Sequence, residues 1–205
     1  MKKLLAIALA LCMVLSIACF ASAESDELIS VGIINNDPTE SGYRAANVAD
    51  MEAVFCEENG FDAQFFYSLK NEEQIAQAKK FISDEVDYLL LSAAATTGWD
   101  SVLKEAEDAG ITVILFDRTI DADESLYAAS VVSDMAKEGE TAVAWLAEQG
   151  LDEYNVIHIQ GVMGSAAQVG RSGALDTQVE ENDNWKIVIQ QTGNWSADEA
   201  KQIVE

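Results

Sequence analysis

Short apolar runs alternate along this chain with longer stretches in which apolar residues recur at helical spacing. The runs have the length of strands, and their continuous apolar character predicts strands that are buried. They cover 28–34, 61–67, 86–91, 111–116, 126–132, 154–160 and 185–190. The predicted helices cover 41–59, a segment that begins at Asn71, 99–109, 134–149, 165–181 and the residues from 197 onward.

The predicted helices have recognisable apolar faces and ends. Their faces are formed by Val48, Met51 and Phe55, by Ile75, Ala78 and Ile82, and by Val102, Leu103 and Ala106. Gly60, Gly110 and Gly150 each follow a predicted helix, as expected for a residue just past a C-cap. Asn71 is a candidate N-cap for the second helix.

Strands that alternate with helices of this length predict right-handed βαβ units on parallel sheets, the α/β class. The segment 120–133 interrupts the alternation, and we interpret it as a crossover between two lobes. We therefore expect a first lobe at 24–131 and a second lobe at 132–205. Because the last helical pattern reaches Glu205 without a cap, we expect the second lobe to be incomplete.

The first residues have the pattern of a secretory signal peptide at 1–23. Lys2 and Lys3 precede an apolar run, and Ala21-Ser22-Ala23 forms a small-x-small cleavage site. A second interpretation uses Cys19, preceded by Ser16-Ile17-Ala18, which is similar to a bacterial lipobox and would place a lipid anchor there. Both interpretations predict an exported protein, periplasmic or extracellular.

The net charge of −24 argues against nucleic acid and anionic lipid as partners. Of three cysteines only Cys56 lies outside the leader, and we expect it to be a core residue of the first helix, without a disulfide. His158, the single histidine, falls within an apolar run and is expected to be structural. We expect no metal and no cofactor.

Asp117 and Arg118 follow directly after the apolar run 111–116. In open α/β sheets, ligands bind outside the carboxyl ends of the strands. A carboxylate accepts hydrogen bonds from hydroxyl groups and a guanidinium donates several in a fixed geometry. The pair suits a small polyol, although the same residues also fit a turn.

The segment 35–44 is a polar loop that leads into the first helix. It contains no glycine-rich phosphate motif, which argues against dinucleotide enzymes and P-loop enzymes. Glu40, Tyr43 and Arg44 could contact a sugar at this helix N-terminus, or Ser41 could simply cap the helix beside Glu40. No nucleophile–base pair is evident, so we expect no enzyme.

Three further features are less specific. The two glycines of 160–165 form a sharp turn before a helix that carries Arg171, which alone is more often a solvated residue. Trp99 and Trp195 each precede a predicted helix, where packing on the sheet is favoured over facing a cleft.

Four segments together resemble the type I periplasmic sugar-binding proteins of ABC importers, most closely the galactofuranose-binding branch. They are 40–44 (Glu-Ser-Gly-Tyr-Arg), 97–106, 116–121 (Phe-Asp-Arg-Thr-Ile-Asp) and 125–127. The branch usually has tryptophan where this chain has Tyr43, and often an acidic residue where it has Gly170.

The resemblance implies a two-lobed clamshell that closes on one monosaccharide. The implied ligand-binding residues are Glu40, Ser41, Gly42, Tyr43, Arg44, Asp117, Arg118 and Arg171. The implied partner is an ABC transporter permease, and the protein is expected to be a monomer. A sugar-sensing subunit of a chemoreceptor or membrane histidine kinase is the alternative.

Overall fold

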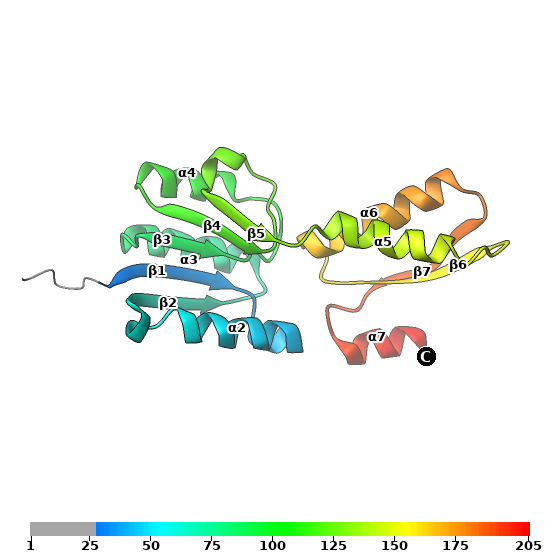
Figure 1. The fold of residues 1–205 in the computed structure, drawn as a ribbon, viewed down its shortest axis with the longest axis horizontal. Coiled ribbons are helices and arrows are strands. Elements are labelled where there is room, and N and C mark those ends of the chain that lie inside the picture. The colour runs from blue at the N-terminus through cyan, green and yellow to red at the C-terminus, as the bar shows by residue number, and fades with distance from the viewer. Residues whose placement is uncertain (1–27) are drawn as a thin grey trace, which may run out of the picture.

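The computed structural model describes residues 28–205, which form two parallel sheets flanked by helices (Figure 1). The predicted signal peptide and the candidate lipid attachment site at Cys19 lie outside the described residues. The larger sheet contains β1 (Ile29–Asn35), β2 (Phe61–Tyr67), β3 (Tyr88–Leu91), β4 (Thr112–Asp117) and β5 (Ala129–Val132). The smaller sheet contains β6 (Tyr154–Gln160) and β7 (Trp185–Thr192).

All strand pairs in both sheets are parallel, which confirms the α/β class. The strand order β2-β1-β3-β4-β5 reverses direction between β1 and β3. Such a reversal opens a crevice at the carboxyl ends of the strands, which is the usual ligand position in this kind of sheet.

The helices associate with the two sheets separately. The larger sheet is accompanied by α2 (Gly42–Val54), α3 (Asn71–Ser83) and α4 (Asp100–Asp108), with short 3₁₀ turns at Pro38–Glu40, Glu57–Asn59 and Glu124–Leu126. On the smaller sheet, α5 (Met135–Ala147) and α6 (Ala166–Glu181) lie on one side and α7 (Ala197–Val204) lies on the other (Figure 1). None of the helices in the described part is long and apolar enough to cross a membrane. The division into lobes at residues 131 and 132 stays a prediction.

The first helix is shorter than its pattern predicts. It ends at Val54, because the backbone of Phe55 leaves the helical region and its ring packs edge-on against Phe61 at 5.0 Å. The placement of Cys56 within a helix core is therefore wrong: Cys56 is extended, only partly buried, and precedes a 3₁₀ turn.

The second helix also differs in its cap and in its buried face. Lys70 occupies the N-cap position, and the Asn71 amide instead donates to the backbone oxygen of Thr97. Of the predicted face, Ala78 is fully buried as expected, whereas Ile75 and Ile82 are half-buried and pack at the margin of the core. Gln74 and Phe81 complete the buried face with Ala78. This face is favoured because the Phe81 ring occupies the space above Gly32, where a Cβ would lie 2.6 Å from the ring.

Two other segments are shorter than predicted. The expected strand 126–132 begins only at Ala129, because Leu126 is the last residue of a 3₁₀ turn and Tyr127 is its C-cap. The strand expected from Val86 begins at Tyr88.

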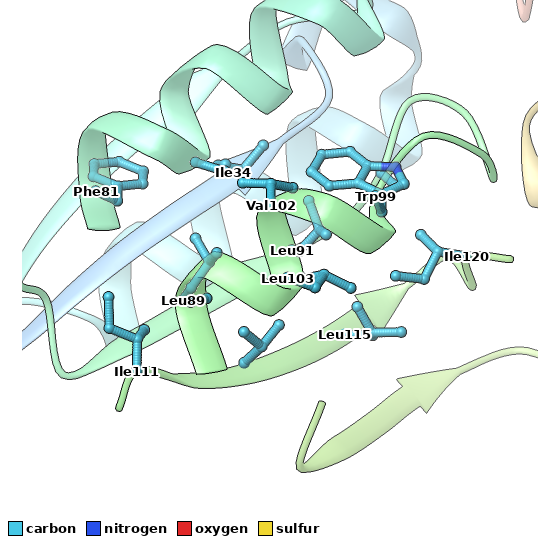
Figure 2. Close-up of a cluster of buried hydrophobic side chains, with 14 of the residues drawn as sticks. Ile34, Phe81, Leu89, Leu91, Trp99, Val102, Leu103, Ile111, Leu115 and Ile120 are labelled. Carbon is cyan, nitrogen blue, oxygen red and sulfur yellow. The ribbon is translucent and has the colours of Figure 1, made fainter. Parts of the chain in front are cut away.

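The main core lies between the larger sheet and helices α3 and α4 (Figure 2). Val102, Leu103 and Ala106 are fully buried, which confirms the predicted face of α4. Trp99 is also fully buried, and its indole donates to the backbone oxygen of Ala95 at 2.9 Å. Packing, rather than a cleft position, is therefore correct for Trp99.

We expect Leu103→Ala to lower the free energy of unfolding by about 2–5 kcal/mol, because the cavity would form among fully buried neighbours. Leu151→Ala is the matched control, since Leu151 is 54% exposed and should change stability by no more than about 0.5 kcal/mol. Urea unfolding followed by circular dichroism measures both. Equal effects of the two variants would contradict this assignment of the core.

Candidate functional site

The polar loop after β1 and the polar residues that end β4 meet at one edge of the larger sheet. Both strands are parallel members of this sheet, so their carboxyl ends lie on the same side. Asp37 caps the 3₁₀ turn in the loop, and the Ser41 hydroxyl caps α2 by accepting from the Arg44 backbone N–H at 3.1 Å. These two caps fix the path of the chain from β1 into α2 and bring Glu40 and Arg44 over the strand ends.

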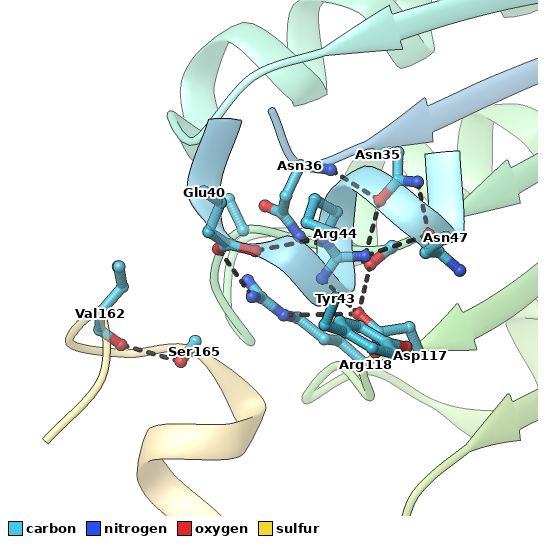
Figure 3. Close-up of polar contacts among 12 residues, drawn as sticks. Asn35, Asn36, Glu40, Tyr43, Arg44, Asn47, Asp117, Arg118, Val162 and Ser165 are labelled. Atoms are coloured by element: carbon cyan, nitrogen blue, oxygen red, sulfur yellow. Dashed lines mark hydrogen bonds and ion pairs between the residues drawn. The ribbon is translucent and has the colours of Figure 1, made fainter. Parts of the chain in front are cut away.

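Glu40, Arg44, Asp117 and Arg118 form a closed ring of ion pairs at this edge (Figure 3). Arg44 contacts Glu40 at 3.1 Å and Asp117 at 2.5 Å. Arg118 contacts Glu40 at 2.8 Å, and its Nε lies 3.7 Å from Asp117. No side chain of the ring is more than 10% exposed, so each charge depends on its partners rather than on water.

Two asparagines complete the hydrogen bonding of Arg44. Its Nη1 donates to Asn35 Oδ1 at 2.8 Å and to Asn47 Oδ1 at 3.3 Å, and Asn35 also donates to Asn47. Sequence reasoning missed this supporting role. The available signal was Asn35 itself, a polar residue directly after the run Val31-Gly32-Ile33-Ile34. In the structure this residue is completely buried.

Asp117 has an unusual backbone conformation, with φ of 62°. Aspartate adopts this left-handed region more readily than most residues, although it is still strained. The turn is tight, since the Arg118 N–H donates to the Phe116 oxygen at 2.6 Å. It places the Asp117 and Arg118 side chains in the same ring although they are adjacent in sequence.

The ring holds Asp117 in its ionised form. Burial by itself would raise the pKa of Asp117, but the charge and hydrogen bond of Arg44, the Tyr43 hydroxyl and the Arg118 charge outweigh it and keep the pKa below its ordinary value. Asp117 is therefore an acceptor of hydrogen bonds at neutral pH.

Tyr43 stands at the rim of the ring. Tyr43 is 60% exposed, yet its hydroxyl donates to Asp117 Oδ1 at 2.7 Å. Partial burial of the hydroxyl and the neighbouring Asp117 carboxylate raise the pKa of Tyr43 to about 12. The phenol therefore keeps its proton and can donate at any physiological pH.

A cleft of about 230 Å³ opens beside the ring and extends to the part of the chain that carries the smaller sheet. Its lining residues are Glu40, Ser41, Tyr43, Arg44, Asp117, Arg118, Met135, Ala167, Arg171 and Trp195. Seven of the eight residues predicted from the sequence therefore lie around one cleft. The exception is Gly42, the first residue of α2, which does not line it.

Arg171 and Trp195 face the ring from the opposite wall. Arg171 is held by Glu138, at 2.7 Å, and its guanidinium lies 5.9 Å from the Trp195 ring centroid. Trp195 fits only because Gly161 has no side chain, since a Cβ there would overlap the indole. Sequence reasoning favoured packing for Trp195 and missed this position in the cleft.

One hydrogen bond joins residues 28–133 to residues 134–205 in the described chain. The Thr96 backbone N–H donates to the Gly164 oxygen at 3.1 Å. No ion pair crosses between these two parts. The cleft walls are thus held independently, each by its own polar contacts.

No group of His, Cys, Asp or Glu side chains within residues 28–205 is arranged to hold a metal ion. His158 lies in β6, where burial lowers its pKa, and its Nε2 is 3.4 Å from the Ser172 hydroxyl. It is not among the cleft residues.

Comparison with known proteins finds relatives that are all named as binding proteins. Residues 31–205 match the periplasmic binding protein domain. The galactofuranose-binding protein YtfQ of Escherichia coli is 35% identical and is aligned over 82% of this chain and 53% of its own length. The fructose import binding protein FruE of Bifidobacterium longum is 32% identical and is aligned over 85% of this chain and 54% of its own length. The chain thus spans about half the length of the curated relatives it matches.

Among solved structures, the periplasmic binding component of the arabinose ABC transporter from a Shewanella species superimposes with a TM-score of 0.75. It is 31% identical, and the match covers 85% of this chain and 58% of that protein. In that structure the protein is bound to α- and β-L-arabinofuranose.

We expect Arg44→Met to lower the free energy of unfolding by about 3–5 kcal/mol, because it removes the closer of the two cations around the buried Asp117 and one of the two that pair with the buried Glu40. Lys137→Met is the control, because Lys137 forms an exposed ion pair with Glu140 on another helix. Such a pair should contribute no more than about 1 kcal/mol to the free energy of unfolding. Chemical denaturation gives both values. Similar losses for the two variants would show that the ring does not stabilise the fold.

We also expect the stability difference between the wild type and Asp117→Asn to narrow at acid pH. The folded-state pKa of Asp117 is lowered, so the stabilisation is complete above the unfolded value of 3.8 and is lost as the pH falls through the folded-state pKa. Asparagine tolerates the positive φ at this position. Unfolding from pH 7 down to about 3 tests this, with the exposed Asp62→Asn as control. A difference that is constant with pH would contradict the ion pairing.

Proposed function

The chain belongs to the periplasmic binding protein domain family, and on that premise we propose that it captures a monosaccharide and delivers it to the permease of an ABC importer. Members of this family are ligand-binding proteins rather than enzymes. The two parts of the chain, at 24–131 and 132–205, would be lobes that close on the sugar.

The observation that carries this proposal is the convergence of charged and aromatic side chains on one small cleft. Asp117 is an ionised acceptor and Arg118 a buried donor on one wall, with Arg171 on the other. Tyr43 and Trp195 add aromatic rings that can cover the apolar face of a sugar. Charged partners make the stronger hydrogen bonds to hydroxyl groups, about 1.5–3 kcal/mol each.

The size of the cleft favours a single sugar ring, and the relatives favour a furanose. At about 230 Å³ the cleft is smaller than the roughly 300–1,000 Å³ of sites for drug-sized ligands. YtfQ is named for galactofuranose, and the solved Shewanella protein is bound to arabinofuranose. A galactofuranose-like sugar, or a related hexose or pentose, is thus the proposed ligand.

Location and partner follow from the sequence pattern and the relatives. We propose that residues 1–23 direct export and that the protein works in the periplasm or outside the cell. FruE is named as an import protein and the Shewanella protein as an ABC transporter component, which favours a permease as partner over a sensor kinase. Stimulation of the permease ATPase by the sugar-loaded protein would support transport.

We expect at least one sugar in a panel of pentoses and hexoses to raise the thermal stability of the protein. A ligand that binds only the folded state, present at about 100 times its dissociation constant, adds about 2.7 kcal/mol to the free energy of unfolding.

For that sugar, Asp117→Ala should weaken binding in titration calorimetry by at least about 2 kcal/mol, or about 30-fold, because a charge-assisted hydrogen bond is lost. Asp62→Ala is the control, since Asp62 is exposed and is not among the cleft residues. Unchanged affinity of the Asp117 variant would remove this residue from the site, and a panel without any stabilising sugar would refute the proposed function.

A further inference from the structure

The Asp117 carboxylate has most of its acceptor capacity occupied by the protein itself. An ionised carboxylate offers about four lone-pair positions, two on each oxygen. Oδ2 accepts from Arg44 at 2.5 Å and from the Ser92 hydroxyl at 3.1 Å. Oδ1 accepts from the Tyr43 hydroxyl at 2.7 Å. One position on Oδ1 therefore remains for a molecule in the cleft.

The three protein donors differ in how firmly they are held. Arg44 is 1% exposed and Ser92 is fully buried, so neither can leave Asp117 without a large loss of pairing. Tyr43, by contrast, is 60% exposed, and a phenol at that position could hydrogen-bond to water instead. Its ring is kept in place by the Arg44 guanidinium, 5.4 Å from the ring centroid, and by the bond to Asp117.

We propose that the Tyr43 hydroxyl determines the selectivity of the cleft by limiting Asp117 to a single ligand hydroxyl. This inference rests on the proposed function, that the cleft binds a monosaccharide. While the Tyr43 hydroxyl occupies one of the two acceptor positions on Oδ1, two neighbouring hydroxyls of a sugar ring cannot both bind Asp117. The second hydroxyl would be desolvated without an acceptor there, so the cleft favours sugars that present one hydroxyl at this point.

Calorimetry of the bound sugar and its monodeoxy analogues tests the inference. In the wild type, removal of the hydroxyl bound to Asp117 should weaken binding about 10- to 100-fold. Removal of its ring neighbour should leave binding unchanged or strengthen it, because that hydroxyl gains no bond to Asp117 and is desolvated without an acceptor there. In Tyr43→Phe, which keeps the ring and frees the second position of Oδ1, the cost of removing the neighbour should rise to about 10-fold.

Tyr67→Phe is the matched control. The Tyr67 hydroxyl donates to the Glu52 carboxylate at 2.8 Å, an equivalent bond outside the cleft lining. This variant should keep the deoxy pattern of the wild type. A second readout is the acid limit of sugar binding, which should move to higher pH in Tyr43→Phe, because the hydrogen bond that helps to keep Asp117 ionised is gone.

The outcomes separate the two proposals. If the wild type binds a sugar but both tyrosine variants keep its deoxy pattern, the role of Tyr43 is refuted and the proposed function stands. Equal weakening of every analogue by Tyr43→Phe would also refute it, because the hydroxyl would then contact the ligand directly. If no sugar binds the wild type, the proposed function fails and this inference fails with it.

Discussion

The geometry of the cleft depends on one constraint, that buried charges must be paired. Two carboxylates and two guanidiniums lie at the strand ends with almost no access to water. Each would be costly alone, and each is tolerated because its neighbours in the ring neutralise it and accept or donate its hydrogen bonds. The loop after β1, the first turn of α2 and the turn after β4 are therefore fixed together.

If the cleft binds a sugar as proposed, this arrangement prepares the binding surface before the ligand arrives. Side chains that already hold one another lose little conformational freedom on binding, so less of the interaction energy is spent on ordering them. The strained backbone at Asp117 belongs to the same preparation, because the ring compensates for its cost. Tyr43 adds a limit on the number of ligand hydroxyls that the carboxylate can receive.

The opposite wall is built by different means. Arg171 is oriented by Glu138 and lies near Trp195, which in turn needs the missing side chain of Gly161. The polar link between the walls, within residues 28–205, is the Thr96–Gly164 hydrogen bond. Two walls joined in this part of the chain by a single hydrogen bond fit the proposed closure of the cleft on a ligand, since hinge closure around ligands is a known motion of binding proteins.

The amino-acid sequence by itself determined the order of strands and helices, the parallel sheets and the position of Asp117 and Arg118 at a strand end. These features follow from periodicity and from local rules that act within a few residues. Local signals did not determine the end of α2, where Phe55 turns to pack on Phe61, or the buried face of α3, which Phe81 sets by packing over Gly32. They also missed Asn35, Asn47 and Trp195. The tertiary structure decided these, because contacts between residues far apart in the chain outweigh local preference. For the same reason, only the fold could show that Tyr43 and Arg44 both donate to the carboxylate of Asp117, which lies more than seventy positions further along the chain.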